Sequence, residues 1–273
     1  MPAAPDASQD LAAREAARAN EYDRYLAALL APKAARPGLI ALAAFQGEVA
    51  RAVETVNEPI MGEIRLQWWR DALPGLRDGA STGSPLADAL GAAMRRHALS
   101  EEAVLTILDA NARALEPGFP AGEDDLSAYL RDSDGTGLQL AARILGVEPG
   151  GAGEGLLAAA AQAGGRVRLL RALPIMLSHG RHPLPPPADT RDADWAAAAE
   201  PVIHAARSWL GKARMQIDGA DRRVIAAVLP LALVEPYLAA LQDLGPDIVR
   251  RRADMSPLAR VWRLWRASVL GRV

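Results

Sequence analysis

Apolar side chains recur every three or four positions along most of the chain, which is the spacing of amphipathic α-helices. The clearest case lies at residues 39–56, where one side of a helix would carry Leu42, Phe45, Gln46, Val49, Val53 and Val56. We predict that this side faces the core. Pro, Gly and Asn interrupt the pattern at residues 37–38, 57–59, 74–75, 81–85, 116–122, 147–155 and 182–194. These breaks predict roughly eight to ten helices.

The composition favours an all-α fold. Of the 273 residues, 50% are hydrophobic, and alanine and leucine dominate while runs of β-branched residues are short. This composition favours helix over sheet, and the length suffices for a sizeable core. The sequence contains no internal repeat of the kind that indicates a solenoid. We interpret the proline-rich segment 182–187 as a loop within one domain. We therefore predict a flexible N-terminus at residues 1–18 and a single-domain helical bundle at residues 19–273.

The charge balance and the termini exclude several classes of protein. Lys and Arg number 31 against 33 Asp and Glu, so we expect no nucleic-acid partner. The absence of cysteine excludes disulfides and thiolate chemistry. Residues 1–20 contain several acids and no apolar segment of the kind found in secretory signals. The longest uncharged apolar run, at residues 224–234, is too short to span a bilayer. We therefore expect neither export nor a membrane-spanning segment, a pattern that leaves the compartment open and is compatible with a cytoplasmic protein.

Short phrases spread over residues 19–271 carry a resemblance to a known family. They are Asp23-Arg24-Tyr25, Arg36-Pro37, Ala43-Ala44-Phe45, Glu58-Pro59, Gly62, the run from Ile64 to Asp71, Tyr129, the run from Asp134 to Leu138, Leu169-Leu170-Arg171, Gly180-Arg181, Pro185, Leu229-Pro230-Leu231, Tyr237-Leu238 and Ser256-Pro257-Leu258. Together they resemble the squalene/phytoene synthase family, the head-to-head branch of the isoprenoid synthase fold. The resemblance implies a helical bundle with a central cavity.

Members of that family carry two DxxxD motifs on facing helices. Acidic residues four apart point the same way along a helix, so two such pairs bind the Mg²⁺ ions that help to ionise a prenyl diphosphate. The resemblance places the first motif about one turn after Phe45. Ala50 and Arg51 occupy the positions where the paired aspartates are expected, and only Glu54 is a carboxylate.

The second motif should follow Arg171, where the sequence has no acid. Ala172 and Met176 occupy its positions, and the whole stretch 164–176 lacks Asp and Glu. His179 and His182 lie three apart beyond it, but without a nearby carboxylate we interpret them as loop residues rather than metal ligands. We therefore expect no catalytic residue, no metal site and no cofactor.

Other residues are candidates for binding a ligand or a partner. Tryptophan stacks on prenyl chains and arginine pairs with phosphate, although core packing is the commoner role of a tryptophan. The segment 132–137 resembles the family's glycine-containing helix interruption, and a helix kink at glycine explains it as well. The candidates are Arg51, Glu54, Arg65, Gln67, Trp68, Trp69, Tyr129 and Arg171.

The C-terminal segment 256–273 is basic and amphipathic. As a helix it would place arginines beside or across from one apolar face, which consists of Leu258, Val261, Trp262, Trp265 and Val269. Such a helix fits peripheral contact with an anionic membrane or with an acidic partner. A terminal helix that packs on the bundle with a solvated basic side explains the pattern equally well.

The missing acids and the retained phrases together define the expected function. The chain is similar to the phytoene-synthase-like assembly factors of respiratory complex I (NADH:ubiquinone oxidoreductase), which keep the tryptophan-rich phrase without the aspartate pairs. The resemblance implies a non-catalytic protein near the inner membrane, with complex I subunits or assembly proteins as partners, or one that binds a prenyl lipid in its cavity. The alternative is a Mg²⁺-dependent prenyltransferase that condenses two prenyl diphosphates head-to-head.

Overall fold

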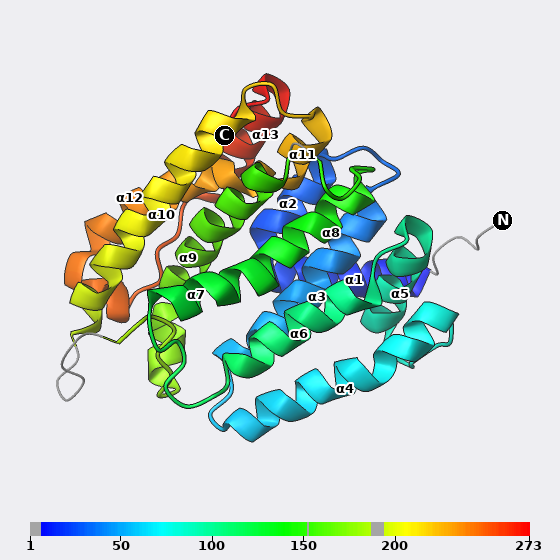
Figure 1. The fold of residues 1–273 in the computed structure, drawn as a ribbon, viewed down its shortest axis with the longest axis horizontal. Helices are drawn as coiled ribbons and strands as arrows, with labels where there is room; N and C mark the ends of the chain where they lie inside the picture. Colours follow the sequence, from blue (N-terminus) through cyan, green and yellow to red (C-terminus); the bar gives the residue numbers. More distant parts are fainter. Residues whose placement is uncertain (1–6, 152, 187–193) are drawn as a thin grey trace.

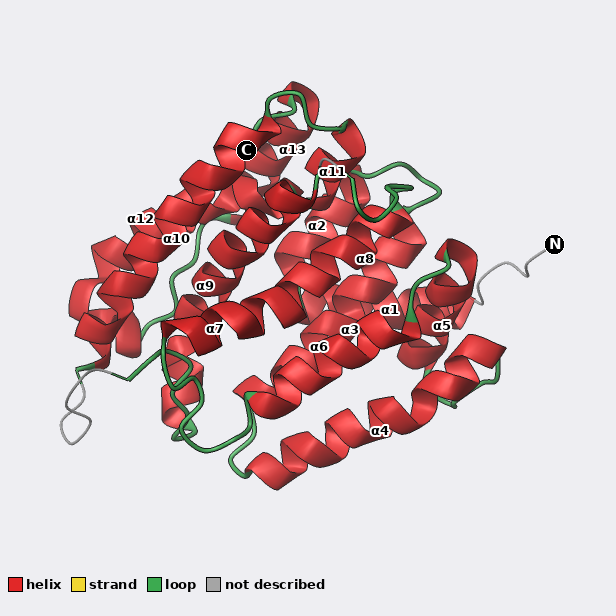
Figure 2. Cartoon of the chain, viewed as in Figure 1, coloured by secondary structure: helices red, strands yellow, loops and turns green. Residues whose placement is uncertain are grey.

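The computed structural model is an all-helical bundle in the part that it describes, residues 7–151, 153–186 and 194–273 (Figure 1). Its α-helices are α1 (Ala7–Asn20), α2 (Tyr22–Leu30), α3 (Arg36–Glu54), α4 (Pro59–Asp78), α5 (Pro85–His97), α6 (Glu101–Arg113), α7 (Glu123–Leu130), α8 (Thr136–Ile144), α9 (Glu154–Ser178), α10 (Trp195–Ile217), α11 (Arg222–Ala227), α12 (Val234–Leu244) and α13 (Pro257–Leu270). The π-helix η1 (Arg131–Gly135) joins α7 to α8, and the 3₁₀ helices η2 (Leu229–Leu233) and η3 (Gly245–Val249) flank α12. Figure 2 shows no strand in these ranges, so the predicted all-α class is confirmed.

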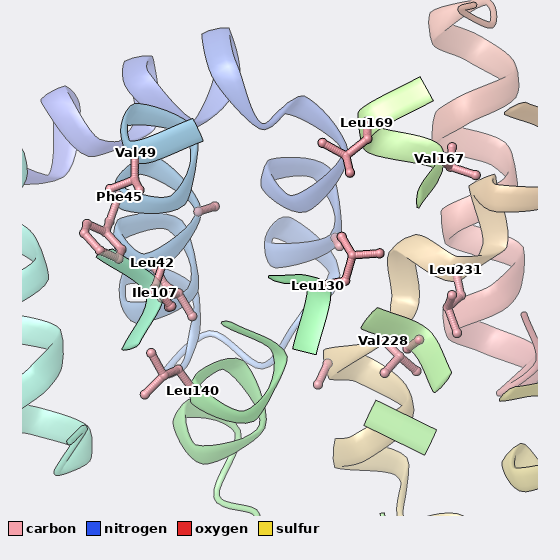
Figure 3. Close-up of a cluster of buried hydrophobic side chains, with 14 of the residues drawn as sticks. Leu42, Phe45, Val49, Ile107, Leu130, Leu140, Val167, Leu169, Val228 and Leu231 are labelled. Carbon is pink, nitrogen blue, oxygen red and sulfur yellow. The ribbon is translucent and has the colours of Figure 1, made fainter. Parts of the chain in front are cut away.

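Two long helices organise the core. Helix α3 packs against α1, α2, α4, α5, α6 and α8, and α9 packs along α10 and against η1 and α12. Figure 3 shows apolar side chains from these and neighbouring helices meeting between them, including Leu42, Phe45, Val49, Ile107, Leu130, Leu140 and Leu169. The predicted inner face of α3 is confirmed, because all six of its side chains are buried.

Helix α4 lies along the outer edge of the bundle, where Figure 1 shows it in cyan. Gly62 permits its contact with α3, because a Cβ atom at that position would lie 2.5 Å from the carbonyl oxygen of Ala52. The predicted break at residues 74–75 is wrong, since α4 continues through Pro74 and ends at Gly79, whose φ is +86°. Pro74 is exposed, so water can reach the carbonyl that loses its helical hydrogen bond there.

The helices are more numerous than the pattern predicted. Thirteen α-helices lie in the described part of the chain, partly because α1 and α2 meet at Glu21 without a proline or glycine to mark the break. The interruption expected at residues 132–137 is the π-helical turn η1.

The predicted flexible N-terminus is wrong from residue 7 onward. Residues 7–20 form α1, which packs against α3 and α5 and buries Ala13 and Ala17. Small side chains at these positions let α1 approach its neighbours closely. Alanines contribute little hydrophobicity, so the sequence pattern did not predict that this segment packs on the bundle. Residues 1–6 of that segment, and Pro187 of the proline-rich loop, lie outside the described residues.

The last helix, α13, does not bury the apolar face that the sequence pattern predicts to be buried. Arg260, Leu264 and Ala267 form its buried face, whereas the apolar stripe that includes Trp262 and Trp265 is exposed. As the second alternative expected, α13 packs on the bundle with basic side chains in solvent, here Arg263 and Arg266, but the apolar face expected to be buried is exposed. Within the described residues, no helix is both long and apolar enough to cross a bilayer.

Candidate functional site

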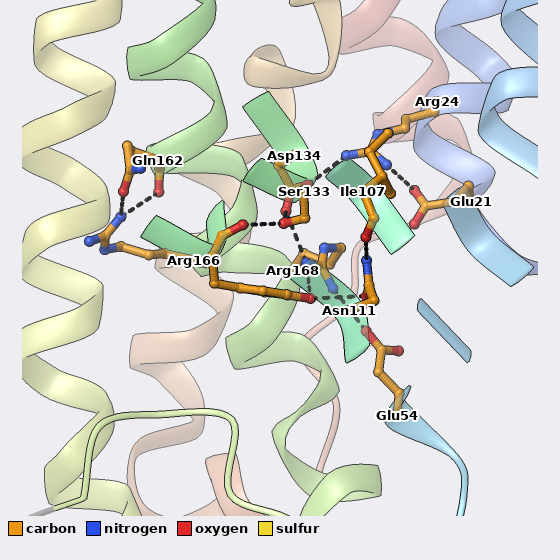
Figure 4. A network of polar contacts seen from close by, with 11 residues as sticks. Glu21, Arg24, Glu54, Ile107, Asn111, Ser133, Asp134, Gln162, Arg166 and Arg168 are labelled. Atoms are coloured by element: carbon orange, nitrogen blue, oxygen red, sulfur yellow. Dashed lines mark hydrogen bonds and ion pairs between the residues drawn. The ribbon is translucent and has the colours of Figure 1, made fainter. Parts of the chain in front are cut away.

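Charged side chains from distant parts of the chain meet in the middle of the bundle, as Figure 4 shows in part. Helix α2 contributes Asp23 and Arg24, the π-helix η1 contributes Asp134, and α9 contributes Arg168 and Arg171. The two arginines of α9 are three residues apart, so they point to the same side of that helix. All five side chains line a cavity of about 100 Å³.

Arg168 is the centre of this cluster. Its guanidinium donates to Glu54 Oε1 at 3.0 Å and to Asp134 Oδ2 at 2.9 Å. It also donates to the hydroxyl of Tyr129 at 3.3 Å. From the other side, Arg24 donates to Asp134 Oδ1 at 2.7 Å. One guanidinium therefore joins the end of α3, the end of α7 and the π-helix to α9.

The two carboxylates beside Arg168 differ in acidity. Burial would raise the pKa of the Asp134 carboxyl, but the charges of Arg168 and Arg24 outweigh it and lower this pKa below its usual value. For Glu54 the effect of burial is larger than the attraction of Arg168, so the pKa of its carboxyl is raised. As the pH falls, Glu54 takes up a proton before Asp134 does.

A second cluster of charges surrounds Asp23. This carboxylate lies 3.3 Å from Arg171 Nη1 and 2.9 Å from Arg260 Nε, and it accepts a hydrogen bond of 2.8 Å from the hydroxyl of Tyr237. The Arg171 guanidinium stacks on the ring of Tyr237 at 3.8 Å from its centre. Burial and the nearby Asp23 charge raise the pKa of Tyr237. The charges in this cluster thus compensate one another.

The cavity between the two clusters is small. Pockets that hold organic ligands usually measure about 300–1,000 Å³, and this one measures about 100 Å³. Helix α9 approaches η1 closely here, since a Cβ atom on Gly165 would lie 2.5 Å from Leu130 Cδ2 and 3.0 Å from Asp134 Oδ2. The predicted central cavity is present, and it is smaller than the usual pocket for an organic ligand.

Three of the predicted binding residues meet at this site. Glu54 and Tyr129 both contact Arg168, and Arg171 lines the cavity beside Asp23. Tyr129 is buried, and its hydroxyl donates to the side chain of Asn111 at 3.4 Å. These residues therefore have structural partners within the chain.

The other predicted binding residues lie away from the cavity. Arg51 is exposed and donates to Asn20 at 3.1 Å, whereas Glu54, one turn further along α3, binds Arg168. Arg65 and Gln67 are on the exposed side of α4, where Gln67 donates to Asp71 at 2.7 Å.

The two adjacent tryptophans of α4 have different environments. Trp69 is only 2% exposed and meets the ring of Phe45 edge-on, with 4.9 Å between ring centroids. Trp68 is 42% exposed and contacts Trp69 at 5.2 Å. Trp69 is a core residue, and Trp68 belongs to the outer surface of α4.

The residues at the two motif positions do not fit Mg²⁺. Ala172 and Met176 are buried apolar side chains, and no group of three or more His, Asp or Glu in the described part of the chain is placed to bind a metal ion. Arg168 lies one helical turn before Ala172, so it points the same way as the missing acid. Its guanidinium binds Glu54 and Asp134, the two carboxylates on either side of it. A fixed positive charge at this place repels a divalent cation.

The two histidines beyond α9 each have a partner in the chain. His179 Nδ1 is hydrogen-bonded to the side chain of Asn57. His182 stacks on Trp195, with ring centroids 4.3 Å apart. They point to different neighbours, in line with their interpretation as loop residues.

The sequence pattern did not single out Arg168, which is central to the site. Its partners Glu54 and Asp134 are 114 and 34 positions away in the chain. A signal was nevertheless present, because three arginines, at 166, 168 and 171, interrupt a helix that otherwise consists largely of alanine, leucine and glycine. A charged residue within such a buried helix needs a partner, so these arginines predict acids on the neighbouring helices.

Comparison with known proteins identifies the family. A model of the squalene/phytoene synthase family matches residues 17–259. The chain belongs to the squalene/phytoene synthase family. The match includes all the residues of the Arg168 cluster and ends within the first turn of α13.

The curated proteins similar in sequence to this chain are named as assembly factors rather than as synthases. The chain is 25% identical over 268 residues to a Bos taurus protein named NADH dehydrogenase (ubiquinone) complex I, assembly factor 6, a match that covers 92% of this chain and 80% of that protein. The Rattus norvegicus protein of the same name is 26% identical over 274 residues, with the same coverage. The Homo sapiens protein is 29% identical over 134 residues, covering 49% of this chain and 40% of that protein.

Solved structures of squalene and dehydrosqualene synthases share the fold. Squalene synthase HpnC from Alicyclobacillus acidocaldarius superposes with a TM-score of 0.70 at 19% identity, over 87% of this chain and 94% of that one. A dehydrosqualene synthase in complex with ligand gives a TM-score of 0.73 at 14% identity, over 96% of each chain. The predicted isoprenoid synthase type of helical bundle is confirmed.

Proposed function

We propose that this squalene/phytoene synthase family member has no prenyltransferase activity and acts as an assembly factor for respiratory complex I. The position of Arg168 is the observation that supports the absence of prenyltransferase activity. Its guanidinium binds Glu54, the last carboxylate of the first motif, and Asp134 at the same time. A prenyltransferase needs carboxylates there that are free to bind Mg²⁺.

Internal charge balance supports the same conclusion. The acids that line the cavity, Glu21, Asp23 and Asp134, each lie within 4 Å of an arginine nitrogen. Such pairs stabilise a folded bundle only when both partners are present. These pairs support a structural role for the site, as a network that connects α2, α3, α7, η1, α9, α12 and α13.

The names of the relatives support the second half of the proposal. Proteins named as complex I assembly factors align with 92% of this chain, and their alignments extend over both motif regions. The proposed partners are subunits or assembly proteins of that complex, and the proposed location is the cytoplasm beside the inner membrane. Because the cavity measures about 100 Å³, we propose that recognition uses the outer surface rather than a lipid inside the bundle.

Deleting the gene in its host tests the assembly role. We expect a lower amount of fully assembled complex I on native gels and a normal amount after complementation with the wild-type gene. Glu54→Gln should complement equally well, because it removes the charge of the last motif carboxylate and retains a hydrogen-bond acceptor for Arg168. Normal complex I in the deletion strain would count against the proposal, and failure of Glu54→Gln with a normally folded protein would favour catalysis.

Purified protein tests the absence of catalysis. With farnesyl or geranylgeranyl diphosphate and Mg²⁺ we expect no diphosphate release above the protein-free control, since Arg168 occupies the carboxylates nearest to the motif positions. Turnover by the wild type that Glu54→Ala abolishes would overturn this half of the proposal. Such a result would leave the deletion experiment as an independent measure of the assembly role.

A further inference from the structure

Helix α13 packs on the bundle through a narrow face that contains one buried arginine. Arg260 is buried, lies 2.9 Å from Asp23 and donates to the hydroxyl of Tyr237 at 3.0 Å. Leu264 and Ala267 complete the inward face. This arrangement uses only a narrow part of the helix for packing and leaves the rest of it on the surface, at the end of the bundle where Figure 1 shows α13 in red.

The outward face of α13 is an apolar stripe. Trp262 and Trp265 are 56% and 46% exposed, and their rings stack with centroids 5.1 Å apart. A helix of 14 residues is about 21 Å long, and exposed apolar side chains extend over its whole length. An exposed apolar surface of this kind on a folded chain marks an interaction site. The stripe consists of Leu258, Val261, Trp262, Trp265 and Val269.

The charges around this stripe have one sign. Arg263 and Arg266 are exposed, neither has an ion-pair partner among the described residues, and α13 contains no acid. The nearest preceding acid in the sequence, Asp254, is already paired with Arg260 and Arg171. The helix therefore presents exposed tryptophans flanked by uncompensated positive charge.

We propose that α13 binds the surface of an anionic lipid bilayer, with its apolar stripe in the headgroup region and Arg263 and Arg266 at lipid phosphates. Tryptophan favours the boundary between lipid and water, and arginine pairs with phosphate there. Each basic residue near such a surface adds attraction to anionic lipid.

The pattern fits a bilayer better than a protein groove. A groove that accepts a helix presents defined pockets for a few anchors and usually matches the charges on both flanks. The α13 stripe is uninterrupted along the helix, and its exposed charges are all positive. Most of α13 lies beyond residue 259, where the match to the family model ends. The inference is independent of the assembly role, because vesicle binding is a property of the purified chain.

Flotation of the full-length chain with lipid vesicles tests the proposal. We expect the protein to float with vesicles of equal parts phosphatidylglycerol and phosphatidylcholine, and to float poorly with phosphatidylcholine alone. Arg263→Gln combined with Arg266→Gln should lower partitioning onto the anionic vesicles by about tenfold to thirtyfold, and added salt should weaken binding of the wild type. Trp262→Glu combined with Trp265→Glu should abolish flotation.

A matched substitution on another helix distinguishes binding through α13 from nonspecific adsorption of exposed tryptophans to vesicles. Trp68 is an exposed tryptophan of similar exposure on α4, so Trp68→Glu should leave flotation unchanged, and circular dichroism should show that each variant is folded. Three results would overturn the proposal: no flotation of the wild type with anionic vesicles, equal flotation with neutral vesicles, or flotation that persists in Trp262→Glu/Trp265→Glu. A wild-type dimer that this double variant dissociates would also overturn it and would assign the stripe to a second copy of the chain.

Discussion

Arg168→Met will lower the free energy of unfolding by about 3–5 kcal/mol, because removing one partner of a buried ion pair leaves the other charge without compensation. Here the substitution leaves Glu54 without its arginine and leaves Asp134 with Arg24 alone. Methionine retains most of the aliphatic volume, so the loss reports the charge rather than a cavity. Denaturant unfolding at neutral pH measures it.

The matching control is Glu54→Gln, alone and combined with Arg168→Met. The glutamine still accepts a hydrogen bond, so the single variant should change stability by about 1 kcal/mol or less. The double variant should lose less than the sum of the two single variants, since the unpaired Glu54 charge is absent. Strict additivity would show that the contact at 3.0 Å contributes no coupling.

The pH dependence of the Arg168→Met deficit follows from the two carboxyls. The pKa of Asp134 is lowered in the folded chain, so its stabilising contribution is present above its unfolded pKa and is lost as the pH falls through the folded value. The pKa of Glu54 is raised, so its contribution is present below its unfolded pKa and is lost as the pH rises through the folded value. In Arg168→Met, protonation neutralises Glu54, which has lost its arginine, while Asp134 keeps its pair with Arg24. The deficit should therefore be largest near neutral pH and shrink towards about pH 4, and a constant deficit would contradict this account.

Trp69→Ala will also destabilise the chain, by about 3–5 kcal/mol, since truncating a buried tryptophan leaves a large cavity. Trp69 is 2% exposed and packs against Phe45 between α3 and α4. Trp68→Ala is the neighbouring control. That residue is 42% exposed and would lose mainly its edge contact with Trp69, for which about 0.5–1.5 kcal/mol is expected.

Thermal and denaturant unfolding of the two alanine variants measure this difference. Comparable losses would mean that Trp68 is packed as tightly as Trp69, contrary to its exposure. Unchanged stability of Trp69→Ala would mean that the side chain serves binding rather than packing. Either result would require a new account of the tryptophan-rich phrase.

Local periodicity accounts for the part of the fold that the sequence predicted. The buried face of α3 was predictable because side chains such as Phe45 and Val49 lie on one side of any helix with that spacing. The direction of α13 was not predictable, because amphipathicity identifies the apolar face without identifying what covers it. In the folded chain the ion pair between Arg260 and Asp23, residues 237 positions apart, determines which face is buried.

The candidate site likewise has features that the sequence predicted and features that it did not. Loss of the motif acids was visible at Ala50, Ala172 and Met176, because each depends only on the residue at one position. The replacement of that chemistry by an arginine network was not visible, since Arg168, Asp134 and Arg24 come together only through tertiary contacts. The residue types at the motif positions follow from the sequence, whereas the pairing of Arg168 with Glu54 and Asp134 follows only from the fold.

The Arg168 guanidinium also limits the design of a Mg²⁺-dependent site in this bundle. Burial would lower its pKa, but the charges of Asp134, Tyr129 and Glu54 raise it well above the usual value, so this cation keeps its proton at any pH the fold tolerates. An aspartate introduced at position 172 would lie one helical turn from Arg168, and one at position 50 would lie one turn from Glu54, which Arg168 already binds. Design of a Mg²⁺ site on this chain therefore has to begin with the removal of Arg168, and added carboxylates can only follow it.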